Sequence, residues 1–397
     1  MTASRTVVVA GAGIGGLTAA LALAAKGFRV VILEKAERLE EAGAGLQLSP
    51  NASHILIELG LQDRLGSRAV TPEAIGIMSA RSGGEIARLP LGDAACRAGA
   101  PYWVVHRADL QSALQARVND NPDIELRLGC QFEDVATDAD GLTVVQRSGM
   151  TRQQEQALAL IGADGVWSAV RHRMFPRTQP QFSGLIAWRG TVEATQLPRE
   201  YASKRVQLWM GSNAHLVAYP ISSGRQINVV AILPGRWSRP GWSACGETME
   251  IKSQFTPQQW PAPARMTIGA VDGWRKWALF TVPAGSAWSS GAVTLLGDAA
   301  HAMLPFAAQG AGMAIEDAAV LAKCLEGIEN AAAIASALQR YAGLRRARVA
   351  RVARAARQNG KIYHLSGAAA LARDLFIQTI GARRMLARQD WIYNWRA

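Results

Sequence analysis

The hydrophobic pattern begins with two short apolar runs separated by a glycine-rich turn and an alanine-rich segment. Residues 6–10 and residues 28–33 are the two apolar runs. Between them, residues 17–26 are rich in alanine and leucine and are followed by a glycine, which is typical of a helix and its end. Continuous apolar runs of this length are typical of strands buried on both faces of a parallel sheet. The pattern therefore predicts a β-α-β unit at the start of the chain.

The pattern of an apolar run, a glycine turn and a helical segment returns twice later in the chain. A different pattern lies between these two returns. "ALALIGADGVWSAVR" and "AVTLLGDAAHAMLPFAAQGAGMAIEDAAVLAKCL" each read as an apolar strand, a glycine turn and a helix. From about residue 178, "FSGLIAWRGTVEA", "RVQLWMG", "HLVAYPIS" and "RQINVVAILPG" read as strands separated by turn residues. We therefore predict an α/β fold in three parts. These are a discontinuous Rossmann-like domain over residues 1–177 and 291–330, an inserted mixed β-sheet domain over 178–290, and C-terminal helices over 331–397.

Composition agrees with a compact protein that has a large core. The chain has 397 residues, of which 49% are hydrophobic and 19% charged. No apolar run reaches the roughly 18 residues of a membrane helix, and no export signal precedes the first strand. The four cysteines lie far apart without metal-ligand spacing: Cys96, Cys130, Cys245 and Cys324. We expect a cytoplasmic protein with reduced thiols, no metal and no stable membrane association.

Positive charge is concentrated near the C-terminus. Residues 340–397 contain 13 Lys or Arg residues and two Asp residues, so this segment accounts for most of the net charge of +12. Leu344, Val349 and Val352 stand among these arginines at roughly helical spacing. The pattern predicts a docked helix whose arginine face lies in solvent, and it lacks the interleaved aromatic residues of a nucleic-acid surface.

A glycine-rich turn, "GAGIGG" at residues 11–16, joins the first predicted strand to the first predicted helix. In the dinucleotide-binding fingerprint, one glycine allows a tight turn, another lets the backbone approach a pyrophosphate, and a third allows close helix–strand packing. Glu34 ends the second strand 18 residues after Gly16, where a carboxylate accepts hydrogen bonds from an adenosine ribose. These residues predict an adenine dinucleotide without choosing between NAD and FAD.

Two aspartates directly follow later apolar runs. Asp164 lies in "GADG" and Asp298 lies in "GDAAH". The carboxyl ends of parallel strands deliver side chains to a bound ligand, so both are candidate ligand contacts. Each could instead be a helix cap or a turn residue. With Glu34, the chain has three acidic residues at the ends of predicted strands, and this repetition favours ligand binding.

These motifs together resemble those of the single-component flavoprotein aromatic hydroxylases, which have the para-hydroxybenzoate hydroxylase fold. The resemblance rests on "GAGIGG" with Glu34, on "GADG", and on "GDAAHAMLPFAAQGAGMAIEDA", in the family order and across essentially the whole chain. The stretch "EAGAGLQLSPNA" and the ending "QDWIYNWRA" are similar to the salicylate hydroxylase branch. That branch includes 3-hydroxybenzoate 6-hydroxylases and 6-hydroxynicotinate 3-monooxygenases.

The resemblance implies FAD as the resident cofactor. It implies that Glu34 binds the ribose, and that Arg107 reaches the pyrophosphate or the ribityl chain unless it is an ordinary surface arginine. The helix that begins near residue 310 would face the flavin edge that becomes negative on reduction, where a helix N-terminus is stabilising. The full set of expected FAD contacts is Gly11, Gly13, Ile14, Gly16, Glu34, Lys35, Gln47, Arg107, Asp164, Asp298, Pro305, Gly310, Ala311 and Gly312.

The chain shows one glycine fingerprint and no second one. The resemblance accordingly implies that NADH or NADPH docks transiently, reduces the flavin and leaves. Molecular oxygen would then form a flavin hydroperoxide, which hydroxylates an electron-rich ring in a site that excludes water. Because ring attack is faster on a deprotonated phenol, a general base is expected near the substrate hydroxyl.

His215 and Tyr219 are the candidate catalytic residues. They stand four residues apart in "HLVAYPIS", and this spacing on a strand places both side chains on one face. In relatives of this branch such a pair lies against the substrate. His215 could instead be a partly buried structural histidine, and His301, within the flavin motif, is expected to be structural.

The expected substrate is a small phenolic aromatic of the hydroxybenzoate or salicylate type. Gln47 and Phe306 stand where the hydroxynicotinate enzymes are expected to have histidines. A hydroxynicotinate substrate is therefore less favoured. Arg189 is a weak candidate to hold a carboxylate, because "AWRG" is widespread in the family. Hydroxynicotinate, urate, a quinolone or a natural product remain alternatives, as does a nucleotide-binding module that binds nucleic acid through its basic tail. The expected partners are the aromatic substrate and oxygen without nucleic acid, in a monomer or homodimer.

Overall fold

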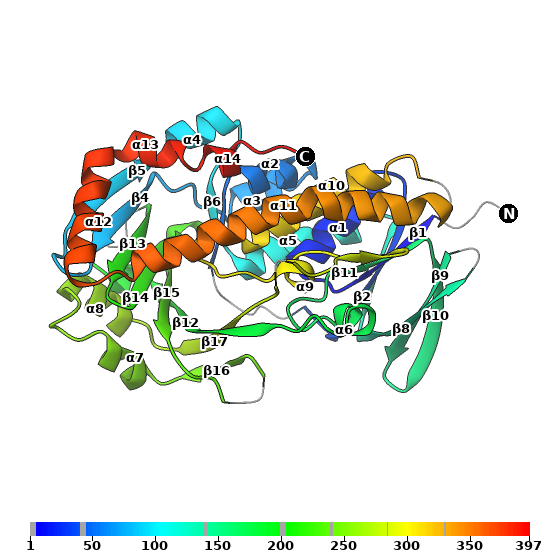
Figure 1. Ribbon diagram of the computed structural model, residues 1–397, viewed down its shortest axis with the longest axis horizontal. Helices are drawn as coiled ribbons and strands as arrows, with labels where there is room; N and C mark the ends of the chain where they lie inside the picture. The colour runs from blue at the N-terminus through cyan, green and yellow to red at the C-terminus, as the bar shows by residue number, and fades with distance from the viewer. Residues whose placement is uncertain are drawn as a thin grey trace.

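The computed structural model describes residues 5–39, 45–138, 141–198, 204–238, 241–283, 285–328 and 331–397. Within these residues the chain forms two large sheets, a three-stranded antiparallel sheet, a two-stranded sheet, and helices that lie along them (Figure 1). The first four residues of the stretch "EAGAGLQLSPNA" fall outside the described part. The α/β class predicted from the sequence is confirmed.

The first sheet carries the predicted β-α-β unit. Its strands, in spatial order, are β18 (Ser289–Ser290), β19 (Val293–Leu295), β11 (Ala159–Gly162), β1 (Thr6–Ala10), β2 (Arg29–Glu34) and β7 (Ile124–Leu128). Neighbouring strands are parallel, apart from the antiparallel pair of β18 and β19. The carboxyl ends of the parallel strands therefore meet at one edge of the sheet.

Both faces of this sheet are covered, which explains its continuous apolar strands. The helices α1 (Ile14–Ala24), α5 (Arg107–Asn119) and α10 (Gly310–Leu325) pack together beside it. The small antiparallel sheet of β8 (Cys130–Asp138), β9 (Gly141–Ser148) and β10 (Thr151–Ala157) also contacts its strands (Figure 1). Every residue of β1 is buried as a result.

The second sheet is mixed, as predicted. Its order is β16 (Ser243–Gly246), β17 (Trp274–Thr281), β12 (Gln181–Glu193), β15 (Gln226–Pro234), β14 (Ala214–Ile221), β13 (Arg205–Gly211), β4 (Ala74–Ser79) and β5 (Glu85–Pro90). Neighbours are antiparallel except for the parallel pair of β13 and β4. The predicted domain boundary at residue 177 does not separate the two sheets, because β4 and β5 come from the N-terminal segment and extend the second sheet along β13.

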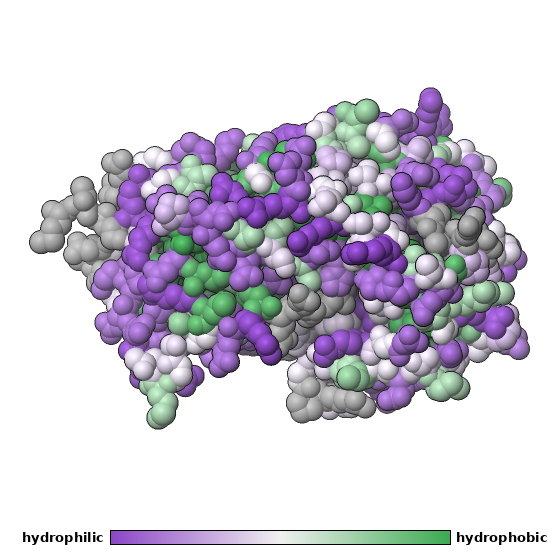
Figure 2. Space-filling view, turned by 180° about the vertical axis from the view of Figure 1, so that it is seen from behind, coloured by the Kyte–Doolittle hydropathy of each residue, from purple (hydrophilic) through white to green (hydrophobic). Residues whose placement is uncertain are grey.

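Shorter elements connect these layers. They are β3 (Gly45–Leu48), β6 (Trp103–His106), α2 (Pro50–Glu58), α3 (Gln62–Gly66), α4 (Leu91–Ala98), α6 (Ala169–Met174), α7 (Thr248–Gln254), α8 (Ala262–Gly269), α9 (Asp298–His301), and the 3-10 turns η1 (Ala194–Gln196) and η2 (Ser222–Gly224). Among the described helices, none has both the length and the hydropathy to span a membrane. Polar residues dominate the face seen in Figure 2, where hydrophobic residues gather in one patch.

The C-terminal region is helical and joins the two sheets. The long helix α11 (Ala331–Tyr363) runs from the side of the first sheet to the second sheet (Figure 1). After it, α12 (Gly367–Ile380) and α13 (Ala382–Ala387) pack against β5, and α14 (Asp390–Tyr393) packs against α2 and α4. The chain thus turns back over the second sheet and ends near the first.

A buried cluster of charged side chains fixes α11 to α10. Glu316 and Asp317 of α10 are fully buried. Arg345 donates from Nε to Asp317 (2.6 Å) and from Nη1 to Glu316 (2.7 Å), and Arg348 donates from Nε to Glu316 (2.6 Å). Burial by itself raises the pKa of Asp317, but His301 and Arg345 outweigh it and lower that pKa to about 2. Charge pairing therefore keeps the Asp317 carboxylate ionised inside the core.

The predicted solvated arginine face of α11 is present only in part. The docked helix is present, and Val349 and Val352 are buried as expected. Leu344, however, is 59% exposed, whereas Arg345 is 1% exposed. The apolar spacing could not show this, because the acidic partners of Arg345 lie on another helix.

Replacing Arg345 by Met should lower the free energy of unfolding by about 3–5 kcal/mol, because two buried carboxylates would lose a partner. Arg354 is an exposed residue of the same helix and provides the matched control. The Arg354→Met variant should change the free energy by less than about 0.5 kcal/mol. Urea unfolding of both variants in one buffer makes the comparison, and equal losses would contradict a structural role for the cluster.

Candidate active site

The glycine turn after β1 is built around two close backbone approaches. Gly11 has φ +105°, and a Cβ there would lie 2.6 Å from the carbonyl oxygen of Ala163, at the end of β11. A Cβ on Gly16 would lie 1.9 Å from the carbonyl oxygen of Gly11. These two glycines allow the tight turn and the close packing of α1 that the fingerprint predicts.

Gly13 differs from its neighbours in the turn. Its φ of −71° suits any residue, and a Cβ there would meet no atom within 4 Å. Gly13 precedes the buried first residue of α1, Ile14, and no side chain caps this helix. The N-terminus of α1 is therefore open at Gly13, which suits an anion such as a pyrophosphate.

Glu34 lies beside this turn at the end of β2. Its carboxylate accepts hydrogen bonds from the backbone N–H of Ala12 (2.8 Å) and of Ala36 (3.0 Å). Each carboxylate oxygen has a further lone pair, so the side chain can also accept from ribose hydroxyls. Lys35, the next residue, is exposed.

Asp164 follows β11. The sequence allowed it to be a ligand contact or a helix cap, and one of its oxygens is a helix cap. Its Oδ2 atom accepts from the backbone N–H of Ala169 (2.7 Å) and of Val170 (3.2 Å) in α6. Its Oδ1 atom is buried and has no hydrogen-bond partner within the described residues. Burial is the main reason why the pKa of Asp164 is raised, although its hydrogen bonds act to lower it. One oxygen therefore caps α6, and the other is free to bind.

Four further predicted cofactor contacts lie at the starts of α9 and α10. Asp298 begins α9 and is exposed, although Gly297 and Ala299 on either side are buried. Gly310 begins α10, where no side chain caps the helix and a Cβ would meet no atom within 4 Å. Ala311 is half-buried, and Gly312 is covered by Gln309 and α2. The predicted helix start is confirmed, and its N-terminus is uncovered at Gly310.

Arg107 is the exposed first residue of α5. Burial lowers the pKa of Arg189 on β12, and the positive charge of Arg107 acts in the same direction to a smaller extent. Arg189 is half-buried, and its guanidinium stands over the ring of Trp277 at 5.6 Å. In the described part of the chain, its enclosed Nε atom has no hydrogen-bond partner. An enclosed guanidinium without a counter-ion is typical of a position that faces a polar or anionic group.

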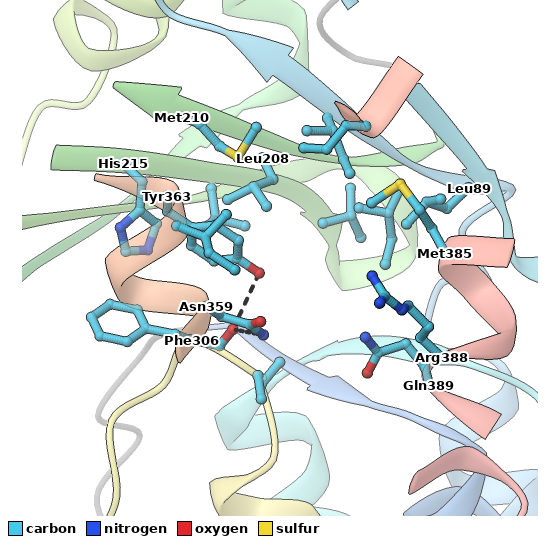
Figure 3. A pocket seen from close by; sticks show the side chains of 18 of the residues that line it. Leu89, Leu208, Met210, His215, Phe306, Asn359, Tyr363, Met385, Arg388 and Gln389 are labelled. Carbon is cyan, nitrogen blue, oxygen red and sulfur yellow. Dashed lines mark hydrogen bonds between the residues drawn. The ribbon is translucent and has the colours of Figure 1, made fainter. Parts of the chain in front are cut away.

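A cavity of about 670 Å³ lies between the second sheet and the C-terminal helices. Gln47, Pro305 and His215 all line it, so three of the predicted residues meet there. Its walls come from β4, β5, β13 and β14, from the loop at residues 305–308, and from α11 to α14. Most of the wall is apolar, as expected for a site that excludes water (Figure 3).

His215 is 2% exposed and makes one polar contact that the sequence did not reveal. Its Nδ1 atom lies 2.8 Å from Nε2 of His364, which follows α11 and is half-buried. The pKa of His215 lies well below its usual value, first because of burial and second because of the nearby His364. Burial also lowers the pKa of His364. Both imidazoles are therefore held in their neutral forms, with one N–H between them.

Tyr219 lies on the same strand as His215 but does not line the cavity. It is 4% exposed and packs below β3, since a Cβ on Gly45 would lie 2.6 Å from its ring. Burial raises the pKa of Tyr219, and Arg189 acts in the opposite direction. The structure thus brings Tyr219 towards Arg189 and β3, rather than against the cavity.

Two residues of α11 hold the loop beneath the cavity. Asn359 donates from Nδ2 to the carbonyl oxygen of Phe306 (3.1 Å), and the Tyr363 hydroxyl donates to the same oxygen (3.3 Å) (Figure 3). The Phe306 ring meets the His215 ring edge-on, with centroids 5.1 Å apart.

His301 has the contacts of a structural residue, since its Nε2 atom lies 2.5 Å from Oδ2 of buried Asp317. Within the described ranges, no group of His, Cys, Asp or Glu could hold a metal.

Comparison with known proteins places this geometry in a family. A family model described as an FAD binding domain matches residues 4–356. The chain is 35% identical over 397 residues to 3-hydroxybenzoate 6-hydroxylase of Polaromonas naphthalenivorans (strain CJ2), covering 99% of this chain and 96% of that protein. It is 37% identical over 397 residues to 3-amino-4-hydroxybenzoate 2-monooxygenase PtnB3 of Streptomyces platensis, covering 98% and 96%.

Solved structures agree with this placement. A salicylate hydroxylase substrate complex matches with a TM-score of 0.82 and 25% identity, over 100% of this chain and 97% of that one. Klebsiella pneumoniae HpxO complexed with FAD and uric acid matches with a TM-score of 0.83 and 24% identity, over 99% and 97%, and supports the fold alone.

Replacing Gly13 by Ala should weaken FAD binding by about tenfold to a hundredfold, because a methyl group would enter the space open for the pyrophosphate at an overpacking cost of about 1–3 kcal/mol. Without FAD, its thermal unfolding should match the wild type, since the methyl meets no protein atom. Gly16→Ala is the contrasting variant, because its methyl collides with the Gly11 carbonyl and should destabilise the fold itself. Flavin fluorescence titration and thermal unfolding separate the two effects, and unchanged FAD affinity in Gly13→Ala would contradict this assignment.

Proposed function

The chain belongs to the FAD-binding family of aromatic hydroxylases and is an FAD-dependent monooxygenase, and from this premise we propose that it hydroxylates a phenolic acid of the hydroxybenzoate type. The reaction would consume NADH or NADPH and molecular oxygen, place one oxygen atom on the ring, and release the other as water. The observation that carries the proposal is the cavity in which His215 and the loop at residues 305–308 meet.

The open positions around the first sheet fit FAD. The pyrophosphate would lie at Gly13, and the adenosine ribose would bind Glu34. Two otherwise unsatisfied atoms, Oδ1 of Asp164 and Nε of Arg189, would gain partners from the cofactor. Asp298 and Arg107 are exposed at helix starts and would bind the ribityl chain and the phosphates. The free N-terminus of α10 would stabilise the negative edge of the reduced ring.

His215 would deprotonate the substrate phenol. Bound FAD supplies the activated oxygen, and the protein must supply the base and keep water out. If the Nδ1–H of His215 donates to His364, the Nε2 atom of His215 is bare and can accept the phenolic proton. The buried ring does not favour a positive charge, so the Nδ1 proton would move on to Nε2 of half-buried His364. His364 would thus orient His215 and lead the proton towards solvent.

Tyr219 would act further along the same strand, outside the cavity. Because it packs below β3 and near Arg189, we assign it to positioning rather than to proton transfer. Gln47 accepts a hydrogen bond from the Tyr102 hydroxyl (2.8 Å) and lines the cavity. Gln47 would therefore present its amide N–H to the cofactor or the substrate.

The cavity is large for a single-ring acid. Its volume of about 670 Å³ lies within the range of about 300–1,000 Å³ that is typical of pockets for drug-sized ligands. A ring that carries further substituents would fill it better than unsubstituted hydroxybenzoate. The substrate panel should therefore include substituted hydroxybenzoates and a non-benzoate ring such as urate.

The test of the proposed function is substrate-dependent oxygen insertion. With bound FAD, one hydroxybenzoate should accelerate NADH or NADPH oxidation at least tenfold over the rate without substrate, with nearly one hydroxylated product per nicotinamide consumed. Oxygen uptake, nicotinamide absorbance and product identification by mass spectrometry give this ratio. Product formed from a non-benzoate ring, with no hydroxybenzoate hydroxylated, would contradict the proposal.

His364→Gln should change the pH dependence of turnover. In the wild type, the acid limb of kcat/KM should lie below pH 6.5, because burial and His364 lower the pKa of His215 and turnover needs neutral imidazole. Removing His364 should raise the pKa of His215, so the acid limb should move to higher pH while kcat falls. His172→Gln, at an exposed position of α6, is the control. An unmoved acid limb in His364→Gln would leave His364 with a structural role only.

A further inference from the structure

The charged residues that line the cavity differ in how their side chains are used. Arg373 is saturated, since it binds Asp374 through Nε (2.8 Å) and Nη2 (2.7 Å) and the carbonyl oxygens of Ile362 (3.0 Å) and Tyr363 (3.2 Å) through Nη1. Arg388 also lines the cavity, but its side chain has no hydrogen bond or ion pair to any described residue. Arg388 is therefore the cavity-lining arginine that is free to bind a ligand.

The side chain of Arg388 points into the cavity. Figure 3 shows the guanidinium beside the Gln389 amide at one end, facing Asn359 and Tyr363, with apolar side chains between the two ends. His215 lies at the opposite end of the same view. The cavity is thus apolar in the middle, with a base at one end and a cation beside an amide at the other.

No acidic side chain of the C-terminal helices is left to neutralise Arg388. In residues 364–397 the acidic residues are Asp374 and Asp390. Asp374 pairs with Arg373, and Asp390 pairs with Arg97 at 3.0 Å. The side chain of Arg388 is exposed and its charge is unpaired, so an anionic ligand group in the cavity would gain both charge pairing and a charge-assisted hydrogen bond there.

The segment that carries Arg388 is held in place. Arg348 donates to the carbonyl oxygens of Trp391 (3.1 Å) and Ile392 (3.3 Å), and Arg351 stands 3.8 Å from the centre of the Trp391 ring. Tyr393 meets Tyr102 edge-on, with centroids 5.9 Å apart. The backbone next to Arg388 is therefore fixed, so its exposed side chain projects from a set position beside the cavity.

We propose that Arg388, together with Gln389, binds the carboxylate of the aromatic substrate, so that the C-terminal segment determines which end of the ring faces His215. This inference rests on the proposed function. The planar guanidinium offers two parallel N–H groups to a carboxylate, and the neighbouring amide N–H adds a further donor. Arg189, the candidate suggested by the sequence, does not line the cavity and stands over Trp277 instead.

The test compares an acid with its neutral analogue in matched variants. The hydroxybenzoate most active with the wild type and its carboxamide are titrated into the FAD-loaded protein, with flavin absorbance giving Kd. Wild type should prefer the acid, and Arg388→Gln should weaken acid binding by about tenfold to a hundredfold, because a hydrogen-bonded charge is lost. Carboxamide binding should hardly change. Arg384→Gln, an exposed residue of α13 outside the cavity lining, should match the wild type.

A second variant protects the test against a folding defect. Gln389→Leu should weaken acid binding by a smaller factor, and the side chain of Gln389 does not cap α14, so the helix should be unaffected. Thermal unfolding of each variant confirms that the fold is intact.

The outcomes separate this inference from the proposed function. If the wild type hydroxylates hydroxybenzoates but Arg388→Gln binds the acid as tightly as Arg384→Gln does, the carboxylate subsite is wrong and the function stands. If the wild type binds the carboxamide as tightly as the acid, the subsite is wrong whatever the substrate. If the wild type hydroxylates no hydroxybenzoate, both fail together.

Discussion

The architecture depends on a pair of adjacent buried carboxylates, Glu316 and Asp317, and the cations that neutralise them. Fully buried carboxylates are tolerated only when they are paired and hydrogen-bonded. Here one α11 arginine, Arg345, binds both carboxylates, and Arg348 and His301 complete the set. Two of these partners come from α11 and the third comes from α9, so the cluster is a joint that connects both helices to α10.

This joint connects the two ends of the proposed active site. Through Asp317 it fixes α9 and the helix α10, whose open N-terminus begins at Gly310. Through Arg348 it fixes the backbone of Trp391 and Ile392, next to the segment that lines the substrate cavity. The position expected for the flavin edge and the far wall of the cavity are therefore set by the same buried charges. A substitution on either side of the cluster should therefore alter both the position expected for the flavin edge and the far wall of the cavity.

The sequence predicted those parts of the site that depend on local chain geometry. The glycine turn, Glu34 and the helix start at Gly310 follow from how parallel strands end and helices begin, and the structure has them in place. It did not predict the contact of His215 with His364, which lie 149 residues apart. Nor did it indicate Arg388, because no periodicity records which wall of a cavity a distant helix completes. For Asp164 the sequence allowed a helix cap or a ligand contact. In the structure one oxygen caps a helix and the other is left free.

In the proposed complex, one cavity holds the substrate between His215 and the C-terminal segment. A crystal structure of the FAD-loaded protein with its most active hydroxybenzoate tests this most directly. We expect the phenolic oxygen within about 3.2 Å of the imidazole of His215, and the carboxylate turned towards Arg388. A substrate bound outside this cavity, or with its carboxylate on Arg189 and its hydroxyl away from His215, would contradict it.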